Sequence, residues 1–138
     1  MRSIAYAGPL LAAALFVSLG ACVAVSAHDE ASAHVVADGS DFTMQPGTQV
    51  LLADHGSLRY LRVLEDSRCK PDVQCIWAGD AQVAFRWTPA GGTALDFSLH
   101  TGRSPKEQTL GGHRLTLVSL SREAAPTAVL RIGLAATP

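Results

Sequence analysis

The sequence has almost no net charge, no long hydrophobic segment and no recognisable catalytic motif. Eleven Lys and Arg residues oppose twelve Asp and Glu residues, so the 138-residue chain carries a net charge of −1. That charge is too weak and too mixed to indicate a nucleic-acid partner. No Ser/His/Asp arrangement, paired carboxylates or glycine-rich phosphate loop is present, so the sequence predicts no enzyme and no cofactor.

The only marked apolar run, from about Leu10 to Leu19, is too short to cross a bilayer as a permanent helix. It follows Arg2 and ends in small residues, which is typical of a secretory signal peptide. The residues Leu19-Gly20-Ala21-Cys22 resemble the lipobox of bacterial lipoproteins. That resemblance implies cleavage before Cys22 and acylation of this cysteine. Residues 1–21 are therefore predicted to be a lipoprotein signal peptide. The acylated Cys22 is predicted to anchor the mature chain in the membrane.

A second cleavage site competes with the first. Val25-Ser26-Ala27 fits an ordinary signal-peptidase site, which would release a soluble periplasmic or secreted protein that starts at His28. Both alternatives remove or modify Cys22 and leave two of the three cysteines to pair, as expected in an oxidising compartment. If Cys22 is acylated, Val23 follows it, and resemblance to Gram-negative lipoproteins then favours the outer membrane, facing the periplasm.

Residues 22–40 are predicted to be a flexible tether. They are rich in Ala, Ser, Asp and His and show no sustained period of 2 or 3.6. His28 and His34 have nearby carboxylates and could bind a divalent metal weakly, but closing a mobile chain around an ion costs conformational entropy. A solvated spacer is therefore the favoured interpretation.

Residues 41–138 are predicted to form one all-β domain. Apolar and polar side chains alternate over residues 81–87, 95–100 and 128–134, which is typical of half-buried antiparallel strands. Shorter or less regular runs lie at residues 41–44, 48–53, 58–65 and 113–120. About seven short strands predict an antiparallel β-sandwich (Ig-like) or a small barrel. Hairpin turns are expected at Gly91-Gly92 and Gly111-Gly112. Val118 and Leu120 break the alternation in their run, which indicates either a bulge or burial on both faces.

The stretch DSRCKPDVQCIWAGD, residues 66–80, holds the two remaining cysteines. A disulfide between Cys69 and Cys75 would close a seven-residue ring worth roughly 2–2.5 kcal/mol in the chain-entropy model, and it is the default in a small exported domain. A zinc site needs about four ligands, and His100 is predicted on the polar face of its strand. A redox pair usually has two intervening residues rather than five. The sequence thus predicts a structural disulfide and no metal.

Four residues in this stretch are candidates for a binding loop. Arg68 is expected either to be held by a carboxylate at the loop base or to stay a solvated charge, and Asp72 to cap a local turn. Val73 lies either under the ring or at its tip. Trp77 is expected to pack on the disulfide or the open end of the core, with a ligand-stacking platform as the alternative. Gly79 is expected to supply a special backbone shape before the next strand.

The same stretch resembles the signature D-S-R-C-P-x-x-V-x-C-x-W-x-G of a family of uncharacterised bacterial exported proteins and lipoproteins. The positions that match are Asp66, Ser67, Arg68, Cys69, Val73, Cys75, Trp77 and Gly79. Lys70 departs from the pattern, with Pro71 one step later, which affects the loop backbone rather than the disulfide. The resemblance implies an exported β-domain and brings no activity with it.

Two functions follow as hypotheses. The first is a non-enzymatic binding or structural module of the cell envelope that contacts an envelope protein or another component through the disulfide loop or a sheet edge. The alternative is a periplasmic protein that handles copper or zinc, because histidines lie near carboxylates at His28, His34, His55 and His100.

Overall fold

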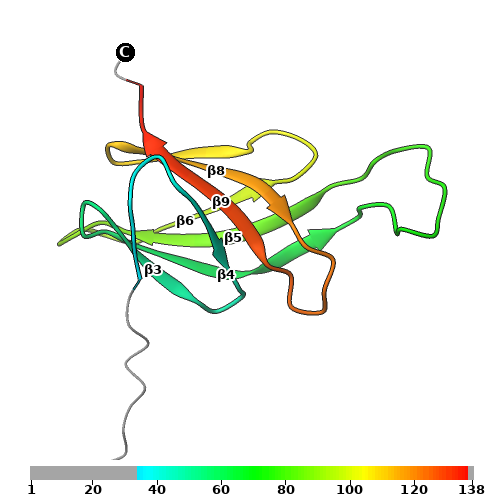
Figure 1. The fold of residues 1–138 in the computed structure, drawn as a ribbon, viewed down its shortest axis with the longest axis horizontal. Coiled ribbons are helices and arrows are strands. Elements are labelled where there is room, and N and C mark those ends of the chain that lie inside the picture. Colours follow the sequence, from blue (N-terminus) through cyan, green and yellow to red (C-terminus); the bar gives the residue numbers. More distant parts are fainter. Residues whose placement is uncertain (1–33, 137–138) are drawn as a thin grey trace, which may run out of the picture. The chain divides into compact units, whose positions relative to one another are not determined.

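The computed structural model describes residues 34–136, which form nine strands in two sheets (Figure 1). The all-β prediction is therefore confirmed. This part of the chain contains no helix that is long and apolar enough to cross a membrane. The predicted signal peptide and the predicted lipidation site at Cys22 lie outside the described residues.

The larger sheet has five strands in the order β1-β3-β4-β5-β6. They are β1 (Val35–Val36), β3 (Gln49–Leu52), β4 (Ser57–Asp66), β5 (Ala81–Thr88) and β6 (Leu95–His100). Strand β1 pairs with β3 in parallel, whereas the other neighbours are antiparallel. The sheet is thus mixed, which the prediction of purely antiparallel strands did not include.

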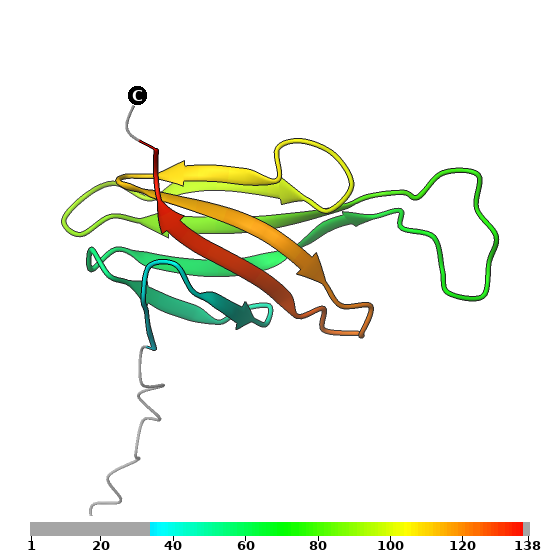
Figure 2. The same ribbon diagram turned by 45° about the horizontal axis from the view of Figure 1, so that its top comes forward.

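The smaller sheet has four antiparallel strands in the order β2-β9-β8-β7. They are β2 (Asp41–Met44), β9 (Ala128–Leu134), β8 (His113–Leu120) and β7 (Glu107–Leu110). Figure 2 shows this sheet lying across the larger one, with β8 and β9 in front. Side chains from both sheets fill the space between them, as in a two-layer β fold.

The core forms where the apolar faces of the two sheets meet. Tyr60 and Phe85 are its largest fully buried side chains, and their ring centroids lie 5.3 Å apart. The Tyr60 hydroxyl donates a hydrogen bond of 3.0 Å to the Pro126 carbonyl in the smaller sheet's β8–β9 connection. Burial with a satisfied hydroxyl is the favourable arrangement for an interior tyrosine.

The folded part begins before Asp41, where the sequence analysis placed the end of the tether. Val36 of β1 is 2% exposed, and the Gly39 amide donates to the Ile132 carbonyl at 2.8 Å. A two-residue strand is too short to show a period of 2, which is why the composition of this segment indicated a spacer.

The predicted hairpin turns are confirmed, and of the two explanations for the broken alternation in β8 the structure shows the bulge. Gly91 and Gly111 have φ of 70° and 60°, in the region that favours glycine. In β8 the register shifts between Leu117 and Ser119, so Val118 is the extra residue and Leu120 returns to the buried face. A bulge thus reconciles the broken alternation with one buried face.

Candidate functional site

Residues 67–80, called the arm below, connect β4 to β5 and extend beyond both sheets (Figures 1 and 2). Two backbone hydrogen bonds cross the arm near its base: the Ser67 amide donates to Asp80 at 2.7 Å and the Cys69 amide to Ala78 at 3.3 Å. Beyond them Cys69 and Cys75 form the predicted disulfide, with an S–S distance of 2.06 Å. The stretch is therefore a hairpin extension whose end is cross-linked.

Gly79 is required by the geometry of the arm base. Its φ is 70°, and a Cβ added there would lie 2.0 Å from the Ser67 carbonyl oxygen. No real Cβ approaches a backbone oxygen so closely, so any other residue would push the two sides of the arm apart. The expectation that Gly79 supplies a special backbone shape is confirmed.

Arg68 fastens the arm to the smaller sheet. Its guanidinium donates to the carbonyls of Leu120 at 2.6 Å and Ser121 at 3.0 Å, and it forms an ion pair with Asp66 at 2.5 Å. The hydrogen bond from Arg68 holds the pKa of Asp66 below its ordinary value. Because the Arg68 side chain is only 9% exposed, it is a structural tie and not a free binding group.

Asp80 fixes the other side of the arm base. One carboxylate oxygen accepts from the Gly102 amide at 2.7 Å, and the other lies 2.5 Å from His100 Nδ1 and 3.0 Å from Arg103 Nε. Burial by itself raises the pKa of Asp80, but these partners together lower it below its ordinary value. The arm is therefore held at both ends by charged hydrogen bonds.

The tip of the arm, residues 70–78, is exposed along its whole length. Val73 is 53%, Ile76 93% and Trp77 82% exposed. The prediction that Trp77 packs on the core is therefore wrong, because the arm carries the residue away from the sheets. Val73 lies at the tip and not under the ring. The tip presents three apolar side chains to solvent close together in sequence, and exposed apolar residues that lie together are candidates for a contact surface.

Two other residues of the tip differ from the sequence analysis. Among residues 34–136 no hydrogen bond to the Asp72 carboxylate is present; instead the Val73 amide closes the turn by donating to Lys70 at 3.1 Å. Sequence reasoning also missed Ile76, the most exposed apolar residue of the tip. The one signal in the sequence was its place next to Cys75, outside any run of alternating apolar and polar residues.

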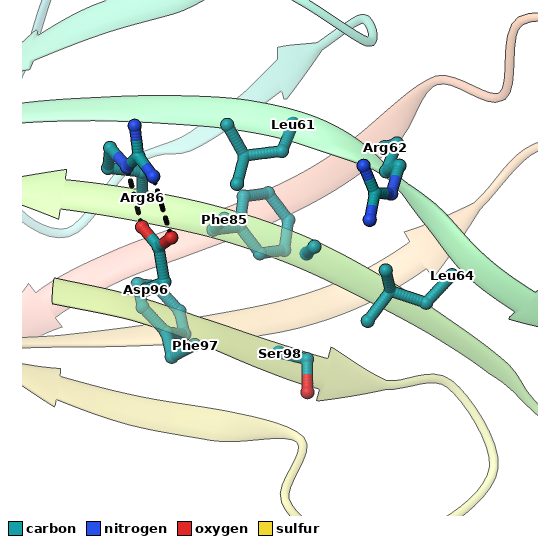
Figure 3. A pocket seen from close by; sticks show the side chains of 9 residues that line it. Leu61, Arg62, Leu64, Phe85, Arg86, Asp96, Phe97 and Ser98 are labelled. Carbon is teal, nitrogen blue, oxygen red and sulfur yellow. Dashed lines mark hydrogen bonds and ion pairs between the residues drawn. The ribbon is translucent and has the colours of Figure 1, made fainter.

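A groove of about 610 Å³ crosses the outer face of the larger sheet (Figure 3). The pairing of β4 with β5 has two irregularities, one between Tyr60 and Arg62 and one between Val63 and Glu65. The extra residues are Leu61 and Leu64, and both line this groove. Arg86 and Asp96 form a bidentate ion pair along one side, with contacts of 2.6 and 2.7 Å. Leu61 follows the buried Tyr60 and Leu64 follows Val63, which packs against the core, so both leucines add apolar surface to the outer face of this sheet.

A smaller cleft of about 280 Å³, lined mainly by charged residues, lies at the base of the arm. The side chains that line it are Asp66, Arg68, Lys70, Pro71, Arg122 and Glu123. Cationic and anionic groups are nearly balanced in this cleft, and Arg68 is already committed to Asp66 and to two carbonyls. The cleft therefore offers no marked preference for an anion or a cation.

The buried histidines are structural. His100, predicted on the polar face of β6, is only 6% exposed and bonds Asp80. His113 lies between Asp38, 2.8 Å from Nδ1, and Asp54, 3.4 Å from Nε2. A carboxylate oxygen thus lies beside each ring nitrogen of His113, so neither nitrogen is free to ligate a metal ion. Among the described residues no group of three or more His, Cys, Asp or Glu side chains could hold a metal ion.

Comparisons with known proteins found no family model, no curated protein and no solved structure that matches this chain. The resemblance of residues 66–79 to a family signature therefore stays a prediction.

Proposed function

We propose that the protein is a lipoprotein of the bacterial cell envelope, anchored through Cys22 in the outer membrane and facing the periplasm, and that it is a non-enzymatic binding module. The proposed anchor is supported by the lipobox-like Leu19–Cys22 stretch directly after an apolar run. A disulfide at Cys69 and Cys75 suits an exported chain.

One observation supports the proposed binding function. The arm is cross-linked by a disulfide, and its tip leaves Ile76 and Trp77 almost fully exposed. Exposed apolar residues have a cost in solubility and aggregation unless a contact outside the chain covers them. A pre-organised loop loses little entropy when it binds, so a small tip can make a useful contact. The arm is thus the contact element of the proposed module.

The anchoring is tested by intact mass. The protein is extracted from its native membrane and measured under native conditions, then denatured, with and without reductant and alkylation. We expect a chain that starts at Cys22 with acyl groups, and two thiols that appear only after reduction. A chain that starts at His28 without lipid would contradict the anchor.

The contact element is tested with a photo-crosslinking amino acid at Ile76, compared with the same amino acid at Val118. Val118 is also an exposed apolar residue, but it lies on β8 of the smaller sheet. We expect adducts with an envelope component from position 76 and none from position 118. Equal yields at both positions would contradict a specific role for the arm.

The alternative of a copper- or zinc-handling protein is tested by calorimetric titration of the folded chain with each metal. No observation among residues 34–136 favours it, and His28 lies outside them. Binding weaker than about micromolar would exclude metal delivery as a function of the domain.

A further inference from the structure

We infer that the component contacted by the arm is a lipid bilayer surface, into whose headgroup boundary the tip inserts Ile76, Trp77 and Val73. This inference deepens the proposed function and rests on it for the proximity that a lipid anchor provides.

The position of the tip favours contact with a membrane surface, because the tip does not fold back onto its own domain. Residues 70–78 are all exposed, and the arm extends past the ends of both sheets (Figure 2). A protruding end can reach a flat surface without a clash between that surface and the rest of the domain. Insertion by a few ångströms suffices, because amphipathic elements at membranes bury their apolar face only about 5–10 Å into the headgroup boundary.

The size of the apolar tip favours lipid over a folded protein partner. One aromatic and two aliphatic side chains expose on the order of 400 Å² of apolar surface. A stable protein–protein interface buries about 800 Å² on each partner. The tip reaches about half of that area, which is small for a protein interface but adequate for an auxiliary membrane contact.

The chemistry of the tip also fits the lipid–water boundary. Trp77 has an apolar body and one N–H donor, and tryptophan is enriched at membrane interfaces for this reason. Lys70 and Asp72 are the only charged residues among residues 70–78, so the tip has no net charge. The contact should therefore depend on apolar burial, and only weakly on salt or on anionic lipid.

The proposed anchor makes a weak contact sufficient. The eleven residues between Cys22 and His34 span at most about 40 Å, so the domain stays close to the bilayer if Cys22 is acylated. Tethering raises the effective concentration of the second contact, and a tip of low affinity is then occupied most of the time. The disulfide and the ties at Arg68 and Asp80 keep the tip ordered before it inserts.

The test follows the fluorescence of Trp77 in the full mature chain reconstituted in phosphatidylcholine vesicles. The variant Trp87→Phe makes Trp77 the single tryptophan, since the chain has two. Trp87 has a buried Nε1 without a partner among the described residues, so phenylalanine removes an unsatisfied donor. Phospholipids with brominated acyl chains quench only tryptophans that reach the hydrocarbon boundary.

We expect brominated lipid to lower Trp77 emission about twofold, and Ile76→Asn to remove roughly half of that quenching. Val118→Asn, which removes an exposed apolar residue elsewhere, should leave the quenching unchanged. The quenching should also persist at about 0.5 M NaCl, where interactions between exposed charges are screened. Emission unaffected by brominated lipid in the acylated chain would overturn the inference, as would crosslinks from position 76 to protein alone.

Failure of the anchor and failure of the insertion give different results. Intact mass of the same sample reports whether the chain is acylated. If it is not, the soluble chain is mixed with vesicles at about 1 mM lipid, where a contact as weak as one myristoyl chain is still detected. Quenching there would support insertion without the anchor, and its absence would overturn insertion.

Discussion

At the residue scale, Asp80 connects the arm to the turn after β6. Because its pKa is lowered in the folded protein, its ionised form stabilises the fold above the unfolded-state pKa of about 4. That contribution is lost as the pH falls through the lower, folded-state pKa. Asp80→Asn should therefore reduce the free energy of unfolding at pH 7 by about 2 kcal/mol. The difference from the wild-type chain should shrink as the pH falls below about 4.

Urea denaturation at pH 7 and pH 3 measures both values. Asp96→Asn is the matched control, because Asp96 pairs with Arg86 on an exposed face, where solvent screens the pair and its contribution to stability is small. An equal loss for Asp80→Asn at both pH values would show that the stabilisation by the Asp80 hydrogen bonds does not depend on the charge of Asp80.

Also at this scale, the contacts of Arg68 and the exposure of Trp77 differ from what the sequence predicts. Arg68 was correctly expected to meet a carboxylate, because Asp66 is two residues away. Its bonds to Leu120 and Ser121 could not be predicted, because they join segments more than fifty residues apart. Trp77 was expected against the disulfide or the open end of the core because it lies two residues past Cys75, but this spacing does not say whether the loop folds back or extends.

At the scale of elements, the shape of the arm depends on Gly79. Gly79→Ala should lower the free energy of unfolding by more than about 2 kcal/mol, because strain at positive φ adds to a clash with the Ser67 carbonyl. Gly91→Ala has the same φ of 70° but open space around its Cβ. It should cost only the conformational strain of about 1 kcal/mol.

Thermal or urea unfolding of these two variants separates strain from steric conflict. A similar loss for Gly79→Ala and Gly91→Ala would show that the arm base opens without penalty. In that case the tip would not be held in one orientation, and its pre-organisation would be lost.

The two strands that sequence reasoning missed share a physical cause. Strand β7 (Glu107–Leu110) buries only Leu110, and β1 has two residues. Neither presents an alternating apolar face, so each is defined by pairing with a neighbour and not by its own sequence. The bulges in β4 had no signal in the sequence, whereas the break in alternation at Val118 in β8 left a bulge and burial on both faces as the two explanations.

At the scale of the whole molecule, the segment that contains β1 belongs to the folded unit. A chain that starts at Asp41 should be less stable than one that starts at Ala31 by about 2–4 kcal/mol. It loses the buried Val36 side chain, the pairing of β1 with β3, and the contact of Asp38 with His113. Urea denaturation of the two chains tests this. Equal urea midpoints for the two chains would show that residues up to 40 do not stabilise the fold and belong to the tether.

The sequence by itself determined the all-β class, most strands, the hairpin glycines and the pairing of Cys69 with Cys75. These features depend on period 2, on local turn chemistry and on a short separation along the chain, all of which a sequence displays directly. Only the tertiary structure decided that Trp77 is exposed, that Arg68 is a tie and that His100 is buried. Such properties depend on which distant segments meet: the direction of the arm is set at its base by Gly79, Asp80 and Arg68, and contacts of that kind leave no periodic signal in the chain.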